Sequence, residues 1–150
     1  MRSLGVMCVG LFLSACALPG ALSLEKGNAP IDISAPSPKG FVYIYRERNF
    51  SGSARGLYIQ ANGVRVGGVN NGTYFIYLAD PGPLTISAED NLDSNNGPKR
   101  TLNINARQRY YVRASLVAGA WDAAPHLELV ESGEGEQAVQ ALSYETLRVH

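Results

Sequence analysis

The sequence predicts an all-β fold, an antiparallel two-sheet sandwich of about seven to eight short strands with a short C-terminal helix. Two observations predict it. Short runs rich in β-branched and aromatic residues recur along the chain, and turns containing glycine, asparagine or proline separate them at regular intervals. The 16 glycines and 8 prolines agree with a chain that contains many turns.

The strongest turn signal lies in the stretch of residues 73–88. Thr73–Leu78 and Leu84–Ala88 are rich in β-branched and aromatic residues, and Ala79–Pro83 between them contains Pro-Gly-Pro. Because proline fixes φ and glycine accepts a positive φ, we expect the chain to reverse there. The pattern predicts a β-hairpin.

Further strands precede this stretch. Phe41–Arg46 is a strong strand signal, and Arg46–Arg55 is expected to be a loop. A second hairpin is predicted from Leu57–Gln60 and Val64–Gly67, because Asn-Gly between them is typical of a two-residue hairpin turn.

After residue 88 the pattern predicts a polar loop, three strands and a helix. The loop covers Glu89–Lys99, and the strands cover Arg100–Ala106, Arg109–Leu116 and His126–Val130. Glu136–Ser143 is predicted to be a helix, because its apolar residues do not alternate and its alanine, glutamine, glutamate and leucine residues favour helix.

Alternation along the strands predicts an aromatic outer face. If the aliphatic residues Val42, Ile44, Ile76, Leu78, Val112 and Ala114 face the core, then Tyr43, Tyr45, Phe75, Tyr77 and Tyr111 face outward. A monomer does not normally expose so many aromatic side chains together, so something is expected to cover them. One cover is the C-terminal segment, through Val139, Leu142 and Leu147. The other is a partner, which makes these five aromatic residues a candidate partner-binding face.

The first residues have the features of an export signal. Arg2 provides a positive charge, and Leu4–Leu13 is an apolar run of about ten residues, well short of the ~20 that span a bilayer. The run ends in Leu13-Ser14-Ala15-Cys16, which resembles the lipobox of bacterial lipoproteins. The resemblance implies cleavage before Cys16 and lipidation of that cysteine. The alternative is a secreted protein cleaved after Ala15, with a chance cysteine following.

These features divide the chain into three parts. Residues 1–15 are expected to be the lipoprotein signal peptide, residues 16–40 the lipidated cysteine and a linker, and residues 41–150 the β domain with its C-terminal helical segment. The linker is rich in proline, alanine, serine and glycine, although Ile31 and Ile33 alternate with Asp32 as an edge strand would. The resemblance to lipoproteins also implies an outer-membrane destination facing the periplasm, because Ala17 stands where an aspartate would retain the protein in the inner membrane.

Several short motifs together resemble one known family. They are Val42-Tyr43-Ile44-Tyr45-Arg46, Gly52-Ser53-Ala54-Arg55, Ala61-Asn62-Gly63 with Val66-Gly67, Asn71-Gly72-Thr73-Tyr74, Pro81-Gly82 and Tyr110-Tyr111-Val112-Arg113. In order and spacing they resemble the bacterial lipoprotein family of domain of unknown function 2846, over about residues 41–130. The resemblance implies a transthyretin-like or regulatory-domain-like β-sandwich and no activity. Pro83 departs from the family, which commonly has a basic residue there.

The sequence offers little for catalysis. His126 follows a proline at the start of a strand, and His150 is the last residue, so a histidine base has few candidates. The common nucleophile, phosphate-loop and zinc motifs do not occur. Glu89–Gly97 is rich in aspartate and asparagine, but it lacks the order of a calcium loop. We therefore predict no catalytic residues, no metal site and no cofactor.

The charges do not indicate a nucleic-acid partner, because 13 basic side chains balance 13 acidic ones. Arginine outnumbers lysine, with Arg46, Arg48 and Arg55 around the first loop and Arg107, Arg109 and Arg113 close together. Arginine binds carboxylates and phosphates with paired hydrogen bonds, yet arginines at solvated strand ends give the same pattern. No site is assigned to them from the sequence.

Two functions are compatible with these features. The first is a non-enzymatic lipoprotein, held at the membrane by its lipid, whose sandwich binds or scaffolds a protein or glycan partner of the envelope. The second is an envelope glycan-modifying enzyme that uses paired carboxylates, which requires two acidic side chains about 5 to 9.5 Å apart across a cleft. The sequence favours the first.

The lipid anchor is directly testable. Growing cells with a labelled fatty acid should label the wild-type protein, whereas Cys16→Ser should carry no label, because the acylated thiol is gone. Gel fluorography of the two purified proteins measures this. Equal labelling of both would exclude lipidation at Cys16.

Overall fold

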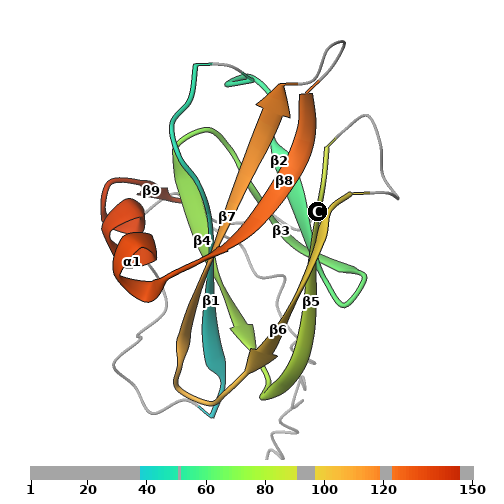
Figure 1. Ribbon diagram of the computed structural model, residues 1–150, viewed down its shortest axis with the longest axis vertical. Helices are drawn as coiled ribbons and strands as arrows, with labels where there is room; N and C mark the ends of the chain where they lie inside the picture. The colour runs from blue at the N-terminus through green and yellow to red at the C-terminus, as the bar shows by residue number, and fades with distance from the viewer. Residues whose placement is uncertain (1–37, 51, 91–96, 119–122, 146–150) are drawn as a thin grey trace, which may run out of the picture.

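The protein folds into two β-sheets that pack face to face, with one helix on the outer face of the larger sheet (Figure 1). The structure is a computed structural model, and it describes residues 38–50, 52–90, 97–118 and 123–145. The strands are β1 (Gly40–Arg46), β2 (Leu57–Ala61), β3 (Val64–Val69), β4 (Thr73–Ala79), β5 (Gly82–Glu89), β6 (Lys99–Ile104), β7 (Arg109–Ala118), β8 (Ala123–Val130) and β9 (Ser143–Tyr144), and the helix is α1 (Ser132–Gln140).

The larger sheet has the order β8-β7-β1-β4-β9, and the smaller one has the order β3-β2-β5-β6. This arrangement confirms the predicted all-β two-sheet sandwich with a short C-terminal helix. The sandwich is not wholly antiparallel, because β1 pairs in parallel with β7 and β4 pairs in parallel with β9. The predicted hairpin of β2 and β3 is confirmed, with Asn62 and Gly63 both at positive φ in its turn.

The hairpin predicted over residues 73–88 is wrong. Both strands exist, but β4 pairs with β1 and β9 in the larger sheet, whereas β5 pairs with β2 and β6 in the smaller one. Only Asp80 and Pro81 lie between them, and Gly82 has a φ of 124°. That conformation is open to glycine alone. It turns the chain across the sandwich into the opposite sheet.

The main core lies between the sheets. It contains residues from both sheets that are shielded from solvent, because one face of each strand carries aliphatic side chains. Its members include Val42, Ile44, Leu57, Ile59, Phe75, Leu84, Ile86, Leu102, Ile104, Val112, Ala114 and Leu127. Val42, Ile44, Val112 and Ala114 therefore face inward as predicted.

The predicted facing of β4 is wrong. Phe75 belongs to the core between the sheets and Tyr77 packs against it, whereas Ile76 and Leu78 lie on the outer face. The pairing with β1 explains this, because residues directly opposite each other in a ladder share a face. Ile44 is opposite Phe75 and Val42 is opposite Tyr77. Phe75 and Tyr77 consequently drop out of the predicted aromatic outer face.

Helix α1 covers part of that outer face. It begins and ends earlier than the predicted Glu136–Ser143, and Ser143 instead begins the short strand β9. Val139 from the helix is buried in an outer cluster, and Leu142 packs against this cluster, as predicted for a C-terminal cover. We name this the outer cluster. Its buried members are Phe41, Tyr43, Tyr45, Ile76, Tyr111, Val130, Val139 and Tyr144.

The predicted lipid anchor at Cys16 and most of the predicted linker precede the described residues. Residues 1–37, with the predicted signal peptide and Cys16, lie outside the described residues, as does Leu147, the third predicted member of the cover. Within the described ranges, no helix has the length and apolar character needed to cross a membrane.

The packing of α1 against the sheet can be tested by substituting two glycines of this helix. A Cβ added at Gly135 would overlap the Cβ and Cγ of Tyr111, whereas nothing lies within 4 Å of a Cβ added at Gly133. Gly135→Ala should therefore destabilise the fold by about 1–3 kcal/mol, because the helix must move off the sheet. Gly133→Ala should be neutral or stabilise it by up to ~1 kcal/mol, since alanine favours helix.

Urea unfolding followed by circular dichroism compares the two variants. Equal stability of both would show that α1 is not held against Tyr111.

Candidate functional site

Tyrosines gather on the outer face of the larger sheet, beside α1. Tyr43 stacks on Tyr111, with ring centroids 4.9 Å apart, because β1 and β7 are parallel neighbours and place these residues opposite each other. Tyr74 on β4 lies 6.4 Å from Tyr43 on its other side and meets Tyr144 edge to face at 5.3 Å. The result is a row of aromatic rings that crosses four strands.

A cavity of about 210 Å³ opens between this row and the helix. One side is aromatic, and the helix side brings apolar and polar groups together. The lining residues are Tyr43, Tyr74, Arg109, Tyr111, Glu136, Val139, Gln140 and Leu142. Pockets that combine an apolar wall with a few polar groups are typical of binding sites.

The polar groups of the cavity come from β7 and α1. Arg109 lies at the start of β7, and its Nη1 is 3.6 Å from Oε1 of Glu136 on the helix. Gln140, exposed at the last position of α1, adds an amide with donors and an acceptor. The cavity can therefore offer hydrogen bonds of both kinds beside aromatic rings.

Burial favours the neutral form of the phenols in this row. It raises the pKa of Tyr43, Tyr74, Tyr111 and Tyr144 above the ordinary value for tyrosine, although Arg109 lowers the pKa of Tyr43 and Tyr111 in part. A neutral phenol donates and accepts hydrogen bonds but is no base at neutral pH. The row is suited to holding a ligand.

The structure divides the predicted binding face. Tyr43 and Tyr111 line the cavity, and Tyr45 is buried in the outer cluster without lining it. Phe75 and Tyr77 do not contribute, because both side chains lie on the core side of β4 and not on its outer face. Sequence reasoning missed Tyr74, although it alternates with Ile76 and Leu78 on the same strand. It also missed Arg109 and Gln140 as lining residues.

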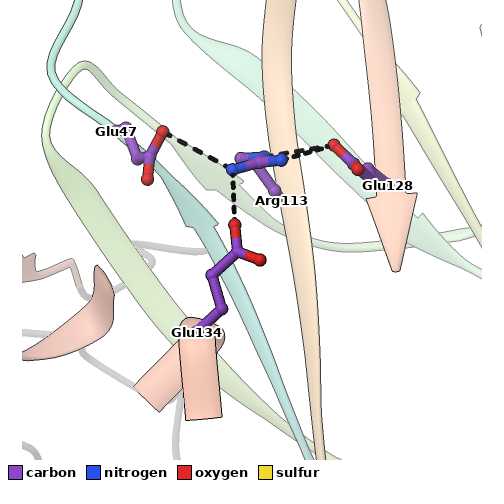
Figure 2. A network of polar contacts seen from close by, with 4 residues as sticks. All are labelled: Glu47, Arg113, Glu128 and Glu134. Carbon is purple, nitrogen blue, oxygen red and sulfur yellow. Dashed lines mark hydrogen bonds and ion pairs between the residues drawn. The ribbon is translucent and has the colours of Figure 1, made fainter. Parts of the chain in front are cut away.

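A polar network joins α1 to the sheet next to the cluster (Figure 2). Arg113 on β7 donates to Glu128 on β8 at 2.7 Å and to Glu134 on α1 at 3.1 Å. Glu47, just after β1, lies 3.9 Å from the same guanidinium. One arginine thus ties together three carboxylates from three parts of the chain.

Within this network, Arg113 holds Glu128 in its ionised form. The hydrogen bond from Arg113 lowers the pKa of Glu128, so that carboxyl is ionised at neutral pH. A glycosidase needs a carboxylic acid whose pKa is raised, so that it can protonate the leaving group. The contacts to Arg113 favour the ionised carboxylate instead.

The hydroxyl of Tyr45 lies buried near this network without a hydrogen-bond partner among the described residues. Burial raises the pKa of Tyr45 to about 12, while Arg113 lowers it and the surrounding glutamates raise it. An unpaired buried hydroxyl destabilises the fold, since it has lost its hydrogen bonds to water.

The other candidate residues from the sequence do not converge. Glu89 and Asp90 are buried at the end of β5, where Glu89 accepts from Gln60 and Asp90 pairs with Arg55. The remaining acidic and amide residues of that predicted loop, 91–96, lie outside the described residues, as does His150. His126 is exposed on β8. In the described part of the chain, no three histidine, cysteine or acidic residues form a group that could hold a metal ion.

Comparison with known families identifies the chain. The family model described as "Protein of unknown function (DUF2846)" matches residues 36–126, which is more than half of the sequence. The chain belongs to the DUF2846 family. Searches of curated proteins and of solved structures found no match.

The matched range of DUF2846 runs from before β1 into β8. It includes the three tyrosines that line the cavity, together with Arg109. Helix α1 and β9 follow the matched range, so Glu136 and Gln140 come from the part of the chain beyond it. In this DUF2846 protein, the strand side of the cavity therefore comes from the matched residues, and the helix side comes from residues after the match.

Replacing Tyr45 by phenylalanine tests the buried hydroxyl. The change removes an unpaired polar atom and keeps the ring, so Tyr45→Phe should leave stability unchanged or raise it by about 1 kcal/mol. Urea unfolding at pH 7 measures this. A loss above ~1 kcal/mol would mean that the hydroxyl has a stabilising partner.

The pH dependence of stability, compared between the wild type and Tyr45→Phe, gives a second measurement. Because the pKa of Tyr45 is about 12 in the folded protein and near 10 when unfolded, ionisation of this phenol costs the fold no stability below pH ~10 and opposes folding above it. Wild-type stability should fall as pH rises from ~10 to ~12, and Tyr45→Phe should fall less steeply. Parallel curves would contradict the raised pKa.

Proposed function

We propose that this protein is a lipid-anchored, non-enzymatic binding module of the bacterial outer membrane, facing the periplasm, which holds a protein or glycan of the envelope in its tyrosine cavity. The observation that carries the proposal is that cavity, where three tyrosines meet an ion pair and an amide beside α1. Aromatic rings with a few polar groups are the common chemistry of recognition sites.

The anchoring part of the proposal rests on the sequence. The apolar run, the small residues Ser14 and Ala15 and the cysteine that follows them have the order of a lipobox. Residues 17–40 could reach up to about 80 Å if fully extended, which would let the sandwich act well away from the lipid surface. An acyl chain contributes about 0.8 kcal/mol per buried CH₂, so a multiply acylated cysteine would be a lasting tether.

Binding is favoured over glycan modification by the charges around the outer cluster. The carboxylates of Glu47, Glu128 and Glu134 all face Arg113, and the phenols of the tyrosine row are neutral. Arg113 lowers the pKa of Glu128, which is the reverse of what a general acid at neutral pH needs. These groups are better suited to orient a partner than to break one of its bonds.

The binding site can be tested by crosslinking in intact cells. A photoreactive phenylalanine at Gln140, which lines the cavity, should give a crosslinked product. The same residue at Thr101, which is exposed on β6 in the other sheet, should give none. Mass spectrometry of the product distinguishes a protein partner from a glycan.

A second pair of variants ties the product to the tyrosines. Tyr74→Ala in the Gln140 crosslinking protein should reduce the yield about tenfold, because it removes an aromatic wall of the cavity. Tyr58→Ala is the matched control, since Tyr58 packs under Arg65 on the other sheet. Equal yields from both crosslinking positions, or cleavage of envelope glycan by the purified chain, would refute the proposal.

A further inference from the structure

A second cavity lies at the end of β1, away from the tyrosine row. The strand β1 ends at Arg46, but its parallel neighbour β7 continues to Ala118, and the chain after β1 diverges from β7 (Figure 1). The space left between them is a cavity of about 90 Å³. Its lining residues are Arg46, Glu47, Arg48 and Asn49 from the β1 side and Arg113, Ala114, Ser115 and Leu116 from β7.

Arg46 is a buried cation at this cavity, with 2% of its surface exposed. Its guanidinium donates to the backbone carbonyl of Arg55 and, at 2.7 Å, to that of Gly52. Within the described ranges it pairs with no carboxylate. Burial lowers the pKa of Arg46, and the neighbouring Arg55 lowers it further. A buried charge without a counter-charge is costly, so an anion here would stabilise it.

Two further donors at the cavity are available. Arg48 is exposed, and its guanidinium makes no ion pair or hydrogen bond with the residues that the structure describes. The half-buried Ser115 has a hydroxyl that is likewise without a partner in that part of the chain. An oxyanion between Arg46 and Arg48 would receive charge-assisted hydrogen bonds from two guanidinium groups.

The acidic residues nearby are engaged elsewhere. Glu47 lines the cavity, but its carboxylate points toward Arg113, where Glu128 and Glu134 also converge (Figure 2). Asp90 pairs with Arg55. Three carboxylates surround the single positive charge of Arg113, so they weaken the positive potential in the cavity. We therefore expect an anion to bind in the cavity with millimolar affinity.

We propose that this cavity binds a phosphate group, held between the guanidinium groups of Arg46 and Arg48. The volume is far above the ~10–15 Å³ that one water needs, yet it is less than half that of the tyrosine cavity. A phosphate group fits this description, whether free in solution or carried by a lipid headgroup. The inference concerns a separate surface and does not depend on the proposed function.

The test compares two arginine variants of the purified full chain. Arg48→Gln removes the charge and keeps the Cγ that packs over Gly72, so the fold should be preserved. Arg107→Gln is the matched control, because Arg107 is also exposed and without a side-chain partner among the described residues, but it lies in the turn before β7, near the start of β1. Circular dichroism verifies that both variants are folded.

Titration with inorganic phosphate at constant ionic strength, followed by calorimetry, gives the affinities. Wild type and Arg107→Gln should bind with the same dissociation constant, and Arg48→Gln should bind about tenfold more weakly. Absence of saturable binding to the wild type would overturn the proposal, and so would equal weakening by both substitutions.

Vesicles containing phosphatidylglycerol distinguish the two sources of phosphate. All three proteins have the same residues ahead of the sandwich, so a difference between them reports on the arginines. If Arg48→Gln weakens binding of both phosphate and vesicles, the site accepts a lipid headgroup. If only the phosphate affinity changes, the site takes a soluble phosphate.

Discussion

The whole fold depends on covering both faces of β1. This strand lies in the middle of the larger sheet, and all of its seven residues are buried. Val42 and Ile44 need the smaller sheet on one side, whereas Phe41, Tyr43 and Tyr45 need a cover on the other. Helix α1 and its neighbours provide that second cover. A strand that is apolar on both faces thus requires three layers at its position.

Local chemistry predicted the strands well and their partners less well. The Asn62-Gly63 turn specifies a two-residue hairpin by its backbone conformation, and β2 and β3 pair as expected. Pro81-Gly82 also reverses the chain, but a short reversal serves equally for a hairpin or for a crossing between sheets. Which one occurs depends on the partners of β4 and β5, and those are distant in the sequence. The facing of Phe75 and Ile76 was wrong for a related reason, since both are apolar and both faces of the sheet are covered.

The candidate site was predicted in part. Tyr43 and Tyr111 were correctly placed on the outer face, because alternation fixes the facing of a strand once one member is known to be inside. The meeting of Arg109 with Glu136 could not be read from the sequence, since it requires the parallel pairing of β1 with β7 and the position of α1. The buried charge of Arg46 was hidden for another reason, namely that an arginine at a strand end usually reaches water.

The parallel pairing of β1 with β7 also bears on how the chain acquires its fold. Phe41–Tyr45 pairs with Arg109–Arg113. The central strand of the larger sheet therefore gains this neighbour only after most of the sandwich has been synthesised. Contacts of such long sequence separation slow folding, because a large loop must close before they form. A chain that folds slowly stays unfolded for longer. That delay would suit a protein that crosses a membrane before it folds.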